Sequence, residues 1–199
     1  MAMRELLSAI AVVFSMGMTG SILAQDLAKG MKAYAAKDYA TALKEWRLLA
    51  ESGNAKAQLW LAMMYRDGEG VIQDYKESGI LFRKAAEQGE VFAQTSLALM
   101  YENGQGVVQD YKEAVVWYRK AADQGDLRAQ YNLGVMYKDG KGVVQDNVYS
   151  HMWYNIAASN DFKGASKWRD ELSNKMTSEE IAKAQELARE CVKKNYKGC

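Results

Sequence analysis

The feature that most constrains this 199-residue chain is a sequence repeat with a period of 36 residues. Residues 54–89 and 90–125 align with 20 identical positions, and residues 126–161 keep 15 identities with the unit before them. Periods of about 20–50 residues are typical of solenoids, in which each unit buries its apolar face against its neighbours. The sequence therefore predicts a tandem array of three repeats, 54–89, 90–125 and 126–161, rather than one globular core.

Each repeat has the pattern of two helices joined by a loop. In the second repeat Ala93, Leu97 and Tyr101 recur every four residues, which places them on one face of a helix. A glycine is expected to end that helix in left-handed backbone, and an aspartate to cap the next one. A glutamate three residues after the aspartate, Glu77 or Glu113, predicts a capping box. The glycines are Gly68, Gly104 and Gly140, and the aspartates are Asp74, Asp110 and Asp146.

The segments that flank the repeats have the pattern of incomplete units. Residues 25–53 are predicted to form a degenerate helical hairpin, and residues 162–199 a C-terminal capping hairpin. The last helix is expected to begin at Thr177, with Glu180 as its capping-box partner. The chain has no proline, which agrees with a nearly all-helical fold. We expect about ten helices in five hairpins, with degenerate units at both ends.

The first 24 residues have the pattern of a secretory signal peptide. A positive start at Arg4 precedes an apolar run, Leu6 to Met18, and Ala24 offers a cleavage point. This run is shorter than the roughly 20 residues that span a bilayer as a helix. We expect residues 1–24 to be removed, which would leave no membrane span, and the mature chain to lie in the periplasm. Secretion, and retention of the signal as an anchor, remain alternatives.

The chain has two cysteines, Cys191 and Cys199, and both lie near its end. In an exported protein such a pair is expected to form a disulfide, which requires Cα atoms about 4.4–6.8 Å apart. Asn195 and Gly198 tolerate left-handed backbone and can supply the turn that brings the cysteines together. The spacing differs from CxxC, so we interpret the pair as a structural staple.

The repeat AQxxLxxMYxxGxGVxQDYxEAxxWYRKAAxQG resembles the Sel-1-like repeat family, a branch of the tetratricopeptide-like superfamily. The segment RDELSNKMTSEEIAKAQELARE, residues 169–190, is similar to an ending common in bacterial members. The resemblance implies an all-α fold, a right-handed α-solenoid of stacked helical hairpins, and a role as a scaffold for protein–protein interaction. The chain departs from the pattern at Leu81, Asn147 and Asp161, where other repeats carry Trp, Tyr and Gly.

Composition and motifs offer little for catalysis, cofactors or metals. With 26 basic and 25 acidic residues, the chain lacks the excess of cations that nucleic-acid binding requires. One histidine and two cysteines cannot supply a zinc site with several such ligands. Asp67, Glu69 and Asp74 share one loop, but the regular ligand pattern of a calcium loop is missing. We expect no cofactor and no metal, and we expect His151 to be a surface or interface residue.

Two other functions remain open beside a periplasmic scaffold. Cysteine-rich members of the Sel-1-like repeat family, which this chain resembles, have been described as penicillin-binding or β-lactamase-like. A cell-envelope enzyme is therefore one alternative. That resemblance rests on a disulfide in each repeat, and residues 54–161 contain no cysteine. The chain also lacks the SxxK, SDN, KTG and GxSxG motifs of such enzymes, so we expect it not to be an enzyme. The second alternative is a secreted factor that acts on host proteins.

The variable positions of the first helices are the predicted partner-binding groove. By analogy with tetratricopeptide grooves, these positions would line an inner surface that binds a protein or peptide. The predicted groove residues are Lys56, Leu59, Trp60, Met63, Phe92, Thr95, Ser96, Leu99, Arg128, Tyr131, Asn132 and Val135. The competing interpretation is that the aromatic members, Trp60, Phe92 and Tyr131, only pack one repeat against the next.

Overall fold

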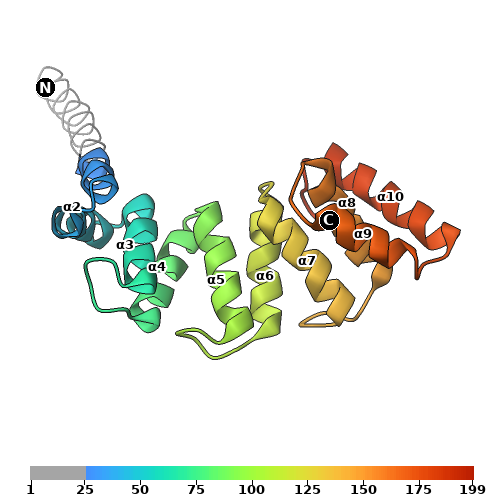
Figure 1. The fold of residues 1–199 in the computed structure, drawn as a ribbon, viewed down its shortest axis with the longest axis horizontal. Coiled ribbons are helices and arrows are strands. Elements are labelled where there is room, and N and C mark those ends of the chain that lie inside the picture. Colours follow the sequence, from blue (N-terminus) through green and yellow to red (C-terminus); the bar gives the residue numbers. More distant parts are fainter. Residues whose placement is uncertain (1–25) are drawn as a thin grey trace, which may run out of the picture. The chain divides into compact units, whose positions relative to one another are not determined.

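A computed structural model describes residues 26–199, so the predicted signal peptide lies outside the described part of the chain. The chain divides into two compact units, one ending at Asp74 and the other comprising Tyr75–Cys199. Within residues 26–199 every regular element is a helix, and each unit is built from packed helices, as predicted (Figure 1). No helix in this range combines the length and the apolar character needed to cross a membrane.

The N-terminal unit is organised around one tryptophan. Residues 26–35 are helical and are followed by α2 (Tyr39–Glu51) and α3 (Ala55–Asp67). Trp46 of α2 is fully buried, and its ring stacks on that of Trp60 from α3 with 5.4 Å between centroids. Tyr34 contacts both rings, at 5.5 and 5.8 Å. These rings fill the space between the helices, so the unit has an aromatic core.

The C-terminal unit contains the remaining helices. They are α4 (Tyr75–Glu87), α5 (Val91–Asn103), α6 (Tyr111–Ala122), α7 (Leu127–Asp139), α8 (Asn147–Ser159), α9 (Ala165–Ser173) and α10 (Ser178–Lys193). From α4 to α8 each helix packs on the next in chain order, and both α9 and α10 pack on α8 (Figure 1). Buried alanines at each contact, such as Ala121 and Ala122, let the helices approach closely.

The loop after each first helix lies on the start of an earlier helix. Gly104 ends α5 with a left-handed φ of 68°, as predicted, and its N–H donates to the carbonyl of Met100. Two residues later Gly106 passes so close to α4 that an added Cβ would lie 2.0 Å from the carbonyl oxygen of Tyr75. The same approach recurs at Gly142, where an added Cβ would lie 2.2 Å from the carbonyl oxygen of Tyr111. Only glycine therefore allows these loops to pack on the helix.

The aspartate caps form as predicted at α6 and α8, but the capping box at Glu113 does not. The Asp110 carboxylate accepts bonds from the N–H groups of Lys112 and Glu113, at 2.8 and 3.1 Å. In a capping box the Asp110 N–H would receive the Glu113 carboxylate. That N–H instead donates to the carbonyl of Tyr101 at 3.0 Å, which closes the loop. The prediction for Glu113 was wrong because the Asp110 N–H is already bonded within the loop. The capping box predicted at Thr177 and Glu180 is present.

A disulfide joins Cys191 in α10 to Cys199, with 5.5 Å between the Cα atoms. Asn195, Tyr196 and Gly198 adopt positive φ angles of 50°, 66° and 69°, which turn the tail back toward the helix. The turn brings the Tyr196 ring to within 3.5 Å of the point where a side chain on Gly125 would begin. The stapled tail therefore packs beside the turn between α6 and α7.

His151 is buried rather than at the surface, which corrects the expectation from the sequence. It lies in α8 with 2% of its surface exposed, and its Nε2 is 3.0 Å from Oγ of Ser173 in α9. The Ser173 hydroxyl donates to the Arg169 carbonyl at 2.9 Å, so Nε2 carries the proton and donates to Ser173. Burial lowers the pKa of His151 below its usual 6.5, and the nearby charge of Arg169 adds to this effect.

The buried imidazole predicts an acid-sensitive contact between α8 and α9. Because the folded-state pKa is lowered, unfolding takes up a proton at low pH. Neutral His151 therefore makes its full contribution to the free energy of unfolding above its unfolded-state pKa of about 6.5. This contribution is lost as the pH falls toward the lower pKa of the folded state. We expect wild type to lose unfolding free energy relative to His151→Gln between about pH 7 and pH 5. Parallel pH profiles of the two proteins, measured by urea unfolding, would contradict this account.

The loop contact at Gly106 predicts a position-specific cost of adding one methyl group. Gly106→Ala places Cβ against a backbone carbonyl and forces an L-residue to a φ of 71°. Gly89→Ala is the matched control, because its φ is 94° and no atom lies within 4 Å of an added Cβ. The left-handed conformation alone costs about 1–2 kcal/mol. In urea unfolding we expect Gly106→Ala to lose more free energy of unfolding than Gly89→Ala. Equal losses would show that the loop does not pack tightly against α4.

Candidate functional site

A hollow of about 390 Å³ lies in the C-terminal unit beside α5 and α7. We call it the α5–α7 hollow. Its lining consists of Phe92, Thr95, Ser96, Gly125, Asp126, Leu127, Arg128 and Phe162. Residues at the starts of α5 and α7, and in the turn before α7, line the hollow. Phe162 lies in the segment that follows α8. The hollow is therefore built by helix starts and by the turns beside them.

The hollow exists because the second repeat carries small side chains at two variable positions. Thr95 and Ser96 stand where the first repeat has Leu59 and Trp60. Both are buried beneath the hollow, with 3% and 7% of their surface exposed. Since neither side chain is large enough to fill the space above α5, the space remains open to solvent.

The polar groups of the hollow are fixed by short bonds. The Asp126 carboxylate oxygen accepts from Thr95 Oγ1 at 3.0 Å and from the N–H of Ala129 at 2.7 Å, which caps α7. The guanidinium of Arg128 is exposed and lies 5.8 Å from the centroid of the Phe92 ring. The hollow thus combines an apolar wall, Phe92 and Phe162, with one exposed cation, Arg128, and with the carboxylate of Asp126, which already accepts the two bonds above. This arrangement can receive an apolar side chain and an adjacent anionic group.

Four of the predicted groove residues come together here: Phe92, Thr95, Ser96 and Arg128. Tyr131 is half-buried and packs against the rings of Tyr154 and Phe162, at 5.5 and 5.2 Å. Its contacts are those of a packing residue that supports the wall of the hollow.

Asn132 is half-buried and does not line the hollow. It lies near Tyr118 of α6, whose hydroxyl donates to the Glu102 carboxylate of α5 at 2.7 Å. Burial, and then the bond to Glu102, raise the pKa of Tyr118, while the nearby Asn132 amide lowers it in part. The Tyr118–Glu102 bond therefore links α5 to α6 beside Asn132.

The remaining predicted groove residues do not line the hollow. Trp60 is a packing residue of the N-terminal unit, stacked on Trp46. The same unit contains Lys56, which is exposed, and Leu59 and Met63, which are half-buried. Leu99 and Val135 are half-buried in the C-terminal unit. The sequence pattern identified the variable positions but could not separate lining from packing.

Phe162 is the lining residue that the sequence analysis missed among the aromatic ones. It follows Asp161, which adopts a positive φ of 58° where the earlier repeats end in glycine. The signal was the departure at Asp161, which marks the point where the chain leaves the repeat pattern.

Three glutamines at one repeat position were also missed: Gln58, Gln94 and Gln130 are buried, and their amides donate to the carbonyls of Ala50, Ala86 and Ala122.

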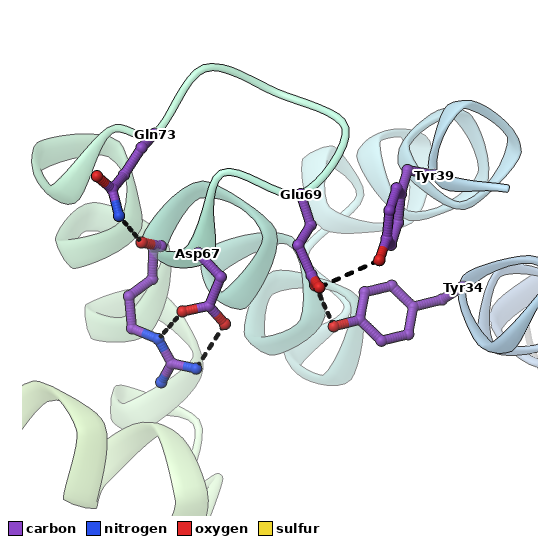
Figure 2. A network of polar contacts seen from close by, with 6 residues as sticks. Tyr34, Tyr39, Asp67, Glu69 and Gln73 are labelled. Atoms are coloured by element: carbon purple, nitrogen blue, oxygen red, sulfur yellow. Dashed lines mark hydrogen bonds and ion pairs between the residues drawn. The ribbon is translucent and has the colours of Figure 1, made fainter. Parts of the chain in front are cut away.

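The acidic loop of the N-terminal unit uses its oxygens within the protein (Figure 2). The Glu69 carboxylate accepts from the hydroxyls of Tyr34 and, at 3.1 Å, of Tyr39. The bond to Glu69 is the main cause that raises the pKa of Tyr34 to about 12. Asp67 pairs with Arg66 through two bonds of 2.8 Å. Across residues 26–199 no group of three or more His, Cys, Asp and Glu side chains is placed to hold a metal ion.

Comparison with known proteins identifies the family to which these repeats belong. The Sel1 repeat matches residues 55–90, 91–126 and 127–162. The chain is similar to the crystal structure of a protective antigen present in uropathogenic Escherichia coli strains, which displays an SLR fold. The two share 29% identity with a TM-score of 0.62, over 93% of this chain and 48% of that one. This chain therefore spans about half the length of the antigen.

A second similar structure is a Sel1 repeat protein from Oxalobacter formigenes. The identity is 37% and the TM-score 0.59, over 65% of this chain and 97% of that one. No curated protein matches the chain. The matching family is one of structural repeats and not a catalytic family. The three matched segments together cover more than half of the residues, and the chain belongs to the Sel1 repeat family.

Proposed function

We propose that this chain is a non-enzymatic scaffold that binds a peptide segment of a protein partner in the α5–α7 hollow. The observation that carries the proposal is the combination of an open space of about 390 Å³, two phenylalanine rings and an exposed arginine. Aromatic and arginine side chains contribute most of the binding energy at protein interfaces. Family membership agrees, since repeat proteins commonly bind partners on extended surfaces.

The lining defines the kind of segment that fits. An apolar side chain would lie against Phe92 and Phe162, and a carboxylate next to it would pair with Arg128. Thr95 cannot compete for that carboxylate as a free donor, because its hydroxyl already donates to Asp126. The preferred segment therefore has a large apolar residue beside an acidic one.

We place the protein outside the cytoplasm, in the periplasm or secreted. The Cys191–Cys199 disulfide supports this location, because structural disulfides persist in oxidising compartments. The similar structure from Escherichia coli is described as a protective antigen, which is consistent with an envelope or secreted protein. The apolar run at Leu6–Met18 supports export from the sequence side.

The contacts of His151 support a non-enzymatic role. A serine nucleophile would have to give its proton to the histidine, but the Ser173 hydroxyl donates to the Arg169 carbonyl. His151 in turn donates to Ser173, so the pair links α8 to α9.

The test is crosslinking of the chain in cells, followed by capture from the envelope fraction. The double variant Phe92→Ser, Arg128→Glu removes the apolar wall and reverses the charge at the hollow. The control, Val116→Ser with Lys112→Glu, likewise replaces one apolar residue by serine and one basic residue by glutamate, at exposed positions of α6 that do not line the hollow. We expect a partner captured by wild type and control to fall by about tenfold or more with the double variant. Equal capture by both variants, each with wild-type circular dichroism, would overturn the proposal.

A further inference from the structure

The turn between α6 and α7 forms part of the α5–α7 hollow, and it differs from the turn one repeat earlier. Gly125 and Asp126 of this turn line the hollow. The earlier turn, between α4 and α5, contains Gly89, whose carbonyl accepts from the side-chain amide of Gln124 at 3.4 Å. The same amide donates to Oε1 of Gln94 at 2.9 Å. Gln124 therefore links the earlier turn to the buried glutamine of α5.

The third repeat has a shorter side chain at the position that makes this link. Asn160 stands where the second repeat has Gln124. Its amide donates instead to the carbonyl of Ile156 at 3.0 Å, at the end of α8. Oε1 of Gln130, the buried glutamine of α7, has no hydrogen-bond partner among the described residues. Asn160 therefore does not link the turn at Gly125 to α7.

The tail closed by the disulfide packs on this turn instead. A side chain added at Gly125 would begin 3.5 Å from Cε2 of Tyr196, which is half-buried. At Gly89 no atom lies within 4 Å of the corresponding point in the described part of the chain. The Tyr196 ring thus contacts the turn that lacks the glutamine link, and it has no counterpart at the turn that has one.

The disulfide constrains the part of the tail that presents Tyr196. Asn195 and Tyr196 both have positive φ angles, 50° and 66°. Left-handed backbone is unfavourable for residues other than glycine, so two in succession persist only where the surrounding structure holds them. The N–H of Tyr196 donates to the carbonyl of Cys191 at 2.9 Å, and the bond from Cys191 to Cys199 closes a ring around both residues. The contact with Gly125 therefore depends on this closed ring.

We propose that the tail disulfide positions the turn at Gly125 through Tyr196, and that its reduction loosens this wall of the α5–α7 hollow. An external dithiol supplies two electrons and two protons, which break the S–S bond and leave two thiols, while the dithiol becomes a disulfide. Tyr196 is a positioning residue, because it does not line the hollow itself. The inference rests on the proposed function, to which it adds control of the site by the redox state of the tail.

The experiment measures hydrogen exchange of the turn amides by NMR, in the oxidised protein and after treatment with dithiothreitol. We expect reduction to accelerate exchange at Gly125 and Asp126 by about tenfold or more, because local opening governs exchange. Gly89 and Glu90 are the internal control, since their amides make the corresponding backbone bonds and Gln124 links their turn in both redox states. Equal acceleration at both turns, or at neither, would overturn the proposal.

Variants separate positioning by the tail from a general loss of stability. Cys199→Ser removes the disulfide without a reductant and is expected to exchange as the reduced protein does. Adding Asn160→Gln to this variant supplies a donor that can reach Gln130 and is expected to restore slow exchange at the turn. With the disulfide intact, Tyr196→Ser is expected to accelerate exchange, whereas Tyr196→Phe keeps the ring and is expected to match wild type. Wild-type exchange in Tyr196→Ser, or no restoration by Asn160→Gln, would overturn the proposal.

Capture of the partner in cells distinguishes failure of this inference from failure of the proposed function. We expect Cys199→Ser to lower capture and the addition of Asn160→Gln to restore it. If Phe92→Ser, Arg128→Glu lowers capture but Cys199→Ser does not, the hollow binds its partner without the tail, and the inference alone fails. If the exchange results hold but Phe92→Ser, Arg128→Glu captures as much as its control, the proposed function fails and the positioning of the turn by the tail stands.

Discussion

The structure depends on the contact between each loop and the start of an earlier helix. In the C-terminal unit Gly106 lies on the carbonyl of Tyr75, and Gly142 on that of Tyr111. The N–H of the aspartate that follows each loop donates to a tyrosine carbonyl, from Asp110 to Tyr101 and from Asp146 to Tyr137, both at 3.0 Å. Each loop is thereby hydrogen-bonded to the first helix of its own repeat and packs against the second helix of the previous repeat. The loop that runs from the glycine ending one helix to the aspartate capping the next therefore also fixes the spacing between repeats, through Gly106 and Gly142.

The candidate binding surface arises where a repeat departs from this shared framework. Ser96 opens the α5–α7 hollow where the first repeat has Trp60. Phe162 reaches this hollow from the segment that follows Asp161, where the third repeat loses its glycine. The framework needs none of these substitutions. In this protein the repeated residues account for the fold, and the residues that differ between repeats account for the open surfaces.

The sequence predicted the features that depend on local backbone chemistry. The 36-residue period, the glycine helix ends and the aspartate caps all follow from residues within a few positions of one another, and the structure contains them. Features that depend on distant contacts were not predictable. Trp60 and Tyr131 pack against rings from other segments, which a single helix face does not reveal. His151 is buried because α9 covers it, and Glu113 forms no capping box because Tyr101 takes the donor.

The most direct test of this account is hydrogen exchange of the loop amides, measured residue by residue by NMR. The account predicts that the amides of Asp110 and Asp146 exchange as slowly as those in the middle of α5 and α7, because loop closure and helix packing open together. The comparison is with the amides of the loop tips, at Val108 and Val144, whose side chains are almost fully exposed. If the aspartate amides exchange as fast as those at the tips, the loops open independently of the helices and do not fix the stacking of the repeats.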